Sequence, residues 1–121
     1  MMSELLEDPL FNITIIVGLI FFLAGFMMYK FPPKKINYLY GYRTVQSMKS
    51  QERWEFAQKY SAKEMMKLGL LLAAFCLLAE ISNFDNDVNL IIGLSLMILI
   101  VVILFVRVEK AIKARFDDEK R

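Results

Sequence analysis

The stretch VNLIIGLSLMILIVVILFV, Val88 to Val106, runs for 19 residues without a charged side chain. At 1.5 Å per residue, a helix of this length covers about 28 Å, which matches the hydrocarbon core of a bilayer. A second uncharged stretch, PLFNITIIVGLIFFLAGFMMY from Pro9 to Tyr29, has 21 residues. Lys30 and then Pro32 and Pro33 end it, because prolines remove backbone donors and do not continue a helix. Both stretches predict membrane-spanning helices.

The composition favours the same class of protein. The chain has 121 residues, of which 57% are hydrophobic, and its mean hydropathy is +0.44. The charged residues gather in blocks between long uncharged runs, whereas a soluble domain of this size needs a polar surface all round. We therefore predict a single all-α integral membrane domain over residues 1–121.

A third apolar segment lies between these two and is less regular. Its uncharged part, Leu68 to Ala79, has only 12 residues and is too short to cross a bilayer alone. It must extend into its flanks, so we predict three transmembrane helices, over about residues 9–30, 62–84 and 88–107. Glu80 then lies about one turn from the end of the middle span.

Small residues recur on the first two predicted helices. Gly69 and Ala73 form a small-x-x-x-small pair on the second, and Gly18 and Gly25 share one face of the first. Such residues let two helix backbones approach closely, which predicts that these faces pack together. The general frequency of glycine in membrane helices is the alternative explanation.

The basic residues define an orientation. Nine of the 15 Lys and Arg residues fall between Lys30 and Lys67, and the other six follow Val106. The segment before the first span and the short Asp85–Asp87 turn contain none. Because cytoplasmic loops collect basic residues, we predict an N-terminus outside and a C-terminus in the cytoplasm. Residues 31–61 become a cytoplasmic loop with an interfacial helix, and residues 108–121 become a charged tail.

The spacing from Ser50 onward predicts the amphipathic interfacial helix. Ser50 is a suitable N-cap, and Trp54 begins an apolar face at three- or four-residue spacing. Lys59, Lys63 and Lys67 form a basic stripe on another face, suited to an anionic inner leaflet. The helix either runs directly into the second span or ends before a separate helix that starts at Ser61 with a capping box.

The tail repeats the helical pattern in a shorter form. Val108, Ile112 and Phe116 share one face, and Glu109 can pair with Lys113 one turn further on. The tail either extends the third helix into the cytoplasm, where it meets the loop, or forms a solvated helix with a frayed end.

Residue types exclude several kinds of chemistry. The chain has one cysteine, Cys76, and no histidine. It therefore lacks an internal disulfide, a Ser-His-Asp triad, a Cys-His pair and a His-ligated zinc site. We expect no cofactor, no metal and no enzymatic activity. We also expect no nucleic-acid partner, because the basic residues lie where membrane topology already requires them.

The loop between Asn37 and Val45 combines alternating tyrosines with Gly41 and with the guanidinium of Arg43 beside the Thr44 hydroxyl. One interpretation is that the tyrosines anchor the loop at the interface, while Arg43 pairs with a lipid phosphate, Glu52 or Glu55. The other is that the loop recognises a partner.

The pattern Asn37-x3-Gly41-Tyr42-Arg43-Thr44, followed by Ser50-x3-Trp54, resembles the signature of the SdpI family of small bacterial membrane proteins. In that family a Pro-Asn-x-x-x-Gly-(Ile/Tyr)-Arg-Thr segment follows the first span, and Ser-x-x-x-Trp leads into the next. The resemblance covers roughly residues 10–105. Ile36 stands in place of the proline that usually precedes Asn37. Gln58 stands where an Asn often follows the tryptophan by four residues.

The resemblance implies a multi-pass protein of the bacterial plasma membrane that acts in immunity or signalling. A family member protects its producer against a toxic membrane-active peptide and is proposed to hold a transcriptional repressor at the membrane. A toxic peptide and a cytoplasmic regulator are therefore the expected partners, beside the lipid bilayer. The residues implied in binding are Asn37, Gly41, Tyr42, Arg43, Thr44, Ser50, Trp54 and Gln58.

Two other functions remain open at this point. The chain could form a homo-oligomeric transporter or channel, because an ionisable group such as Glu80 within a span often serves ion movement. Its place near the end of the span equally suits a structural, interfacial carboxylate. A membrane enzyme would use Arg43 to hold a phosphate and Glu52 or Glu55 as acid or base, yet a solvated helix face explains these carboxylates more simply.

Overall fold

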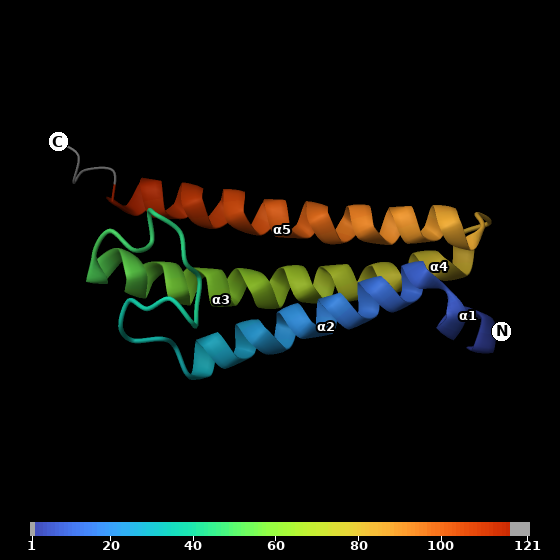
Figure 1. Ribbon diagram of the computed structural model, residues 1–121, viewed down its shortest axis with the longest axis horizontal. Helices are drawn as coiled ribbons and strands as arrows, with labels where there is room; N and C mark the ends of the chain where they lie inside the picture. Colours follow the sequence, from blue (N-terminus) through green and yellow to red (C-terminus); the bar gives the residue numbers. More distant parts are fainter. Residues whose placement is uncertain (1, 117–121) are drawn as a thin grey trace.

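The computed structural model describes residues 2–116, which contain helices and no strands. The elements are α1 (Met2–Glu7), α2 (Pro9–Lys30), α3 (Gln51–Ala74), the 3₁₀ helix η1 (Phe75–Leu77), α4 (Leu78–Ile81) and α5 (Asn86–Phe116). Three long helices, α2, α3 and α5, lie side by side (Figure 1). The loop between α2 and α3 gathers at one end of this bundle, and α1 and the turn between α4 and α5 lie at the other. The all-α class is confirmed.

Two of these helices, α2 and α5, are long and apolar enough to cross a membrane. Both leave large apolar side chains exposed along their length, such as Ile20 on α2 and Ile98 on α5. A continuous exposed apolar surface of this kind is typical of helices that face lipid. The predicted middle span corresponds to the end of α3, η1 and α4, where charges persist as far as Lys67. The third span and the orientation therefore stay predictions.

Helix α3 begins where the sequence predicts. Ser50 has an extended backbone and its Oγ accepts a hydrogen bond from the Arg53 N–H at 3.1 Å, as an N-cap does. The helix then continues without a break to Ala74. A separate helix starting at Ser61 is therefore wrong, because the Ser61 Oγ donates back to the Gln58 carbonyl inside one continuous helix.

The close approach of α2 and α3 depends on glycine. A Cβ atom added at Gly18 would lie 2.6 Å from both the Gly69 carbonyl oxygen and the Ala73 nitrogen. A Cβ added at Gly69 would lie 2.6 Å from the Gly18 carbonyl oxygen, and one at Gly25 would lie 2.7 Å from that of Ala62. These distances leave no room for a side chain, so the predicted packing of the small residues is confirmed.

The predicted extension of the third helix is also confirmed. Helix α5 continues past Arg107 to Phe116, and Val108, Ile112 and Phe116 are buried in the core that it shares with α3. The Phe116 ring packs edge-on against Phe56 of α3, with 5.8 Å between ring centroids. Residues 117–121, the end of the predicted tail, lie outside the described residues.

Candidate functional site

The loop between α2 and α3 forms the candidate site, and Asn37 shapes its first part. The Asn37 Oδ1 accepts hydrogen bonds from the backbone N–H groups of Leu39 and Tyr40 at 2.9 and 2.8 Å. Its Nδ2 donates to the Lys35 carbonyl at 2.9 Å. A short amide side chain that bonds the backbone on both sides holds a tight turn. Asn37 is therefore a structural residue of the loop.

Gly41 and Gln58 form the next contact. Gly41 has a φ of +107°, a conformation that disfavours residues with a side chain. A Cβ there would also lie 2.5 Å from the Gln58 Oε1 and 2.6 Å from the Pro33 Cγ. Glycine is therefore required twice over, for its backbone conformation and for its contact with α3.

Gln58 clamps the backbone of Tyr42. Its Oε1 accepts from the Tyr42 N–H and its Nε2 donates to the Tyr42 carbonyl, both at 2.7 Å. Gln58 is only 1% exposed, so no water replaces these bonds. A buried amide with both ends satisfied fixes the loop against α3.

Tyr42 and Thr44 attach the loop to α5 through one carboxylate. The Tyr42 hydroxyl donates to the Glu109 Oε2 at 2.8 Å, and the Thr44 hydroxyl donates to the same oxygen at 3.0 Å. The Tyr42 ring packs against Phe105, with centroids 5.5 Å apart. Burial and the bond to the Glu109 carboxylate together raise the pKa of the Tyr42 phenol well above its ordinary value.

A compact turn closes the loop before α3. The Ser47 Oγ accepts from the Thr44 N–H at 2.8 Å, and the Ser47 N–H donates to the Thr44 Oγ1 at 3.2 Å. The Met48 N–H donates to the Thr44 carbonyl at 3.1 Å. Ser47 is fully buried, although nothing in the sequence distinguished it from the other polar residues of the loop.

Trp54 connects the segment after α2 to α3. Its side chain is fully buried, and its Nε1 donates to the Pro33 carbonyl at 2.6 Å. The prolines therefore do more than end α2, because one of them supplies the acceptor that satisfies the buried indole. Trp54 and Gln58 lie one turn apart on α3 and hold successive parts of the loop.

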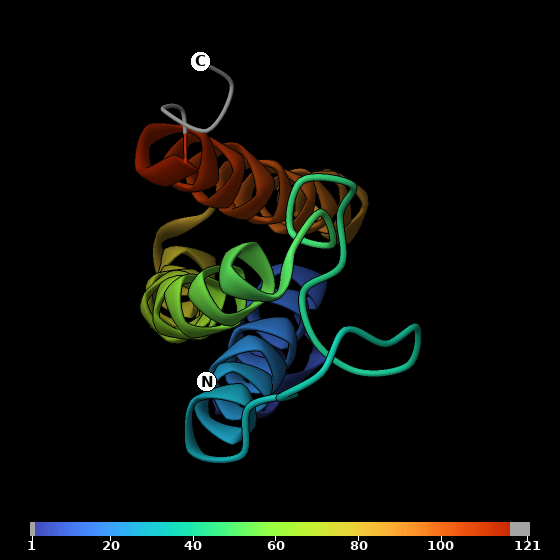
Figure 2. The ribbon, with the colours of Figure 1, turned by 90° about the vertical axis from the view of Figure 1, so that its left-hand side faces the viewer.

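Arg43 differs from the other seven residues that the family resemblance implies in binding. It is exposed, and within residues 2–116 it forms no hydrogen bond or ion pair. The predicted pairing of Arg43 with Glu52 or Glu55 is therefore absent. Viewed from this end, the loop forms two lobes, one projecting away from the helices and one lying against α5 (Figure 2). Tyr38 and Val45 are 81% and 78% exposed, so apolar groups accompany Arg43 on the surface.

Two carboxylates of the site, Glu64 and Glu109, have contacts that differ from those the sequence predicts. The sequence offers Lys113 as a partner for Glu109, and Glu64 is the last residue of the possible capping box that begins at Ser61. Glu109 instead holds Tyr42 and Thr44, and Glu64 is buried and bonded to Arg107. The sequence offers one signal for these two roles. Glu64 and Glu109 each lie in a region where basic residues outnumber carboxylates.

Glu80 lies far from the loop, at the opposite end of the bundle. It is exposed on α4 and lines a cavity at that end together with Glu4 and Asp8. The Asp8 carboxylate accepts two bonds from the Asn89 Nδ2, at 3.0 and 3.2 Å, and these join α5 to the start of α2. Within residues 2–116, no group of three or more Cys, Asp or Glu residues is placed to hold a metal ion.

Comparison with known proteins matches the region that carries this geometry. A family model described as the SdpI/YfhL protein family matches residues 34–107, which include the loop, α3 and most of α5. The chain is also 41% identical over 96 residues to "Uncharacterized protein YfhL" of Bacillus subtilis (strain 168), covering 79% of this chain and 82% of that protein. No solved structure matches the chain.

Proposed function

This chain belongs to the SdpI/YfhL family, and we propose that it is a multi-pass protein of the bacterial plasma membrane that acts in immunity or signalling. In this proposal three spans cross the bilayer, with the N-terminus outside and the C-terminus in the cytoplasm. The loop between α2 and α3 then lies at the cytoplasmic surface. Its partners are a membrane-active peptide and a cytoplasmic regulator.

The exposed Arg43 on an internally bonded loop is the observation that supports this function. Its neighbours Tyr42 and Thr44 are both bonded to Glu109, so the backbone on either side of Arg43 is held in place. A side chain on a fixed backbone loses little conformational freedom when it binds. A guanidinium presents a planar set of donors that pairs with carboxylates, so the regulator is expected to offer an acidic group.

Replacing Arg43 tests this function directly. We expect cells that produce Arg43→Ala to lose protection against a membrane-active peptide, while the protein still accumulates in the membrane at the normal level. Lys49→Ala is the matched control, because Lys49 is an exposed cation of the same loop. Full protection by Arg43→Ala at equal abundance would contradict the proposed role of the loop.

The alternative, a homo-oligomeric transporter that uses Glu80, has less support. Glu80 is exposed at the end of the bundle, where water reaches it, and the buried Glu64 is already paired with Arg107. An ionisable group that carries ions is expected to face the bundle interior. A flux assay in liposomes with Glu80→Gln distinguishes this alternative, because flux that depends on Glu80 would favour it.

A further inference from the structure

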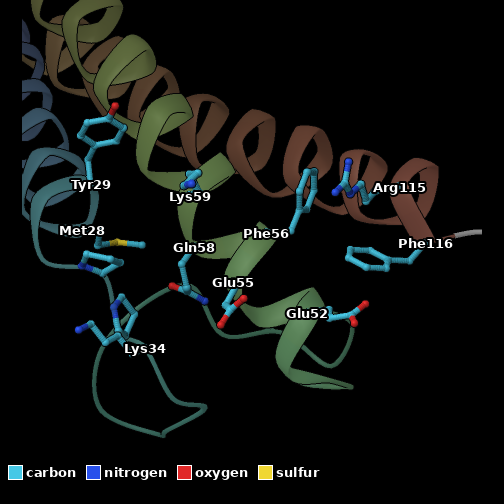
Figure 3. A pocket seen from close by; sticks show the side chains of 12 residues that line it. Met28, Tyr29, Lys34, Glu52, Glu55, Phe56, Gln58, Lys59, Arg115 and Phe116 are labelled. Atoms are coloured by element: carbon cyan, nitrogen blue, oxygen red, sulfur yellow. The ribbon is translucent and has the colours of Figure 1, made fainter.

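A groove of about 720 Å³ opens at the end of the bundle that carries the loop. Met28 and Tyr29, in the last turn of α2, lie on one side, and Phe56 and Phe116 lie on the other (Figure 3). Small-molecule sites in proteins commonly measure about 300–1,000 Å³. The groove is therefore large enough for a lipid headgroup with the first part of an acyl chain.

The far wall of the groove is held in place by its own contacts. Phe56 packs edge-on against Phe116, and the Arg115 guanidinium lies 5.6 Å from the centroid of the Phe56 ring. Phe56 also stacks on Tyr60, with centroids 5.7 Å apart. These contacts join the aromatic side chains of α3 and α5 into one apolar wall of the groove.

Charges of both signs line the same groove without pairing with one another. Lys34 and Lys59 are exposed, and so are Glu52 and Glu55. Within residues 2–116 none of the four forms an ion pair, although Glu55 and Lys59 lie one turn apart on α3. The Glu55 carboxylate instead accepts a bond from the Gln51 Nε2 at 3.1 Å. These lysines and carboxylates are not paired with one another. They therefore suit a ligand that carries both a positive and a negative charge.

The depth of the groove matches that of lipid headgroups. It begins at Met28 and Tyr29, where the apolar stretch of α2 ends, and Lys30 follows directly. Tyrosine and lysine side chains collect at this level of a membrane. An acyl chain that enters beside Met28 would run along the exposed apolar surface of α2.

We propose that this groove binds one aminophospholipid, such as phosphatidylethanolamine. The basic side chains receive the phosphate, the carboxylates receive the ammonium group, and the apolar walls receive the upper part of one acyl chain. The proposal rests on the membrane placement of α2 and does not depend on the role in immunity or signalling.

Native mass spectrometry of the purified full chain can measure this binding. The protein, in a mild detergent, is mixed with equal amounts of phosphatidylethanolamine, phosphatidylglycerol and phosphatidylcholine that carry the same acyl chains. We expect phosphatidylethanolamine to be retained about tenfold more than phosphatidylcholine, because a methylated ammonium cannot donate hydrogen bonds to Glu52 and Glu55. We expect phosphatidylglycerol to be retained less as well, because it has no cation.

Two variants separate the parts of the site. Lys59→Ala should reduce the retention of all three lipids about three- to tenfold, since each carries a phosphate. Glu52→Gln should lower the preference for phosphatidylethanolamine over phosphatidylcholine about threefold, since only the Glu55 carboxylate then remains, and should leave the retention of phosphatidylcholine nearly unchanged. Lys63→Ala is the matched control, because Lys63 lies one turn from Lys59 on the exposed side of α3 and does not line the groove.

Several results would overturn the proposal. Equal retention of the three lipids would show only a general lipid shell, and a preference for phosphatidylglycerol would show that the carboxylates are not involved. An equal loss in Lys63→Ala and Lys59→Ala would indicate general surface charge. Membrane fractionation of the same protein tests the placement of α2 separately from the lipid site.

Discussion

The Gln58 side chain bonds both backbone groups of Tyr42, a residue 16 positions earlier in the chain, at 2.7 Å each. This relationship fixes the position of the loop on α3. It also determines which neighbours point inward, since Tyr42 then reaches Glu109 on α5 while Arg43 remains exposed. The exposure of Arg43 is therefore a consequence of the bonds made by residues around it.

Gln58→Leu should destabilise the protein by about 1–3 kcal/mol, because it leaves the buried Tyr42 N–H without a partner and the Tyr42 carbonyl with only the long bond from the Ser47 Oγ, at 3.4 Å. Gln58→Asn keeps the amide and should cost less, although its side chain is shorter by one methylene group. Thermal unfolding in detergent measures both variants. An equal melting temperature for Gln58→Leu and the unmodified protein would show that the clamp does not stabilise the fold.

Gly41→Ala should loosen the loop without unfolding the helices. A methyl group at a φ of +107° and 2.5 Å from the Gln58 Oε1 strains the backbone by about 1–3 kcal/mol. We expect faster proteolytic cleavage between α2 and α3 at unchanged helical content by circular dichroism. Gly93→Ala is the control, since a Cβ at Gly93 would meet only the flexible Ile13 side chain, at 3.2 Å or more, besides more distant atoms. Equal cleavage rates in the two variants would contradict the role of Gly41.

Raising the pH should release the loop from α5. The pKa of Tyr42 is raised in the folded protein, so its phenol keeps a proton that the unfolded chain loses near pH 10. The stabilisation from this group is therefore complete below about pH 10 and is lost as the pH rises further. Tyr42→Phe should remove this part of the pH dependence, measured as melting temperature against pH. An unchanged alkaline profile in that variant would assign the loss to other groups.

Glu109→Gln should weaken the docking of the loop, because a neutral amide replaces the carboxylate that accepts from both Tyr42 and Thr44. Hydrogen bonds to a charged group contribute about 1.5–3 kcal/mol each, and this pair is only partly buried. We expect faster amide hydrogen exchange at residues 42–48. Lys113→Ala is the control, because the alternative pairing of Glu109 with Lys113 predicts the same effect for both variants.

Gly69→Ala should disturb the contact between α2 and α3. Its Cβ would lie 2.6 Å from the Gly18 carbonyl oxygen and 2.7 Å from the Phe22 nitrogen, both backbone atoms that cannot move without shifting α2. We expect a lower melting temperature and a lower yield of folded protein in detergent. A melting temperature equal to that of the unmodified protein would show that the two helices are free to separate.

Features that depend on neighbouring residues were predictable from the sequence. The end of α2 near Lys30, the Ser50 cap of α3 and the buried stripe from Val108 to Phe116 follow from prolines, a capping hydroxyl and helical spacing. These signals act within one or two turns, so they can be read along the chain. The close packing of Gly18 and Gly69 was predictable for a similar reason, because small residues mark a helix face.

The amino-acid sequence by itself determined the all-α class and the apolar helices. It also carried the loop motif by which the chain resembles its family. Only the tertiary structure decided that Glu109 binds Tyr42 and Thr44 and that Gln58 clamps the loop. It also decided that Lys34, Lys59, Glu52 and Glu55 share one groove without pairing. The physical reason is distance along the chain. A hydrogen bond between residues 67 positions apart depends on how whole helices pack, and local spacing carries no record of it.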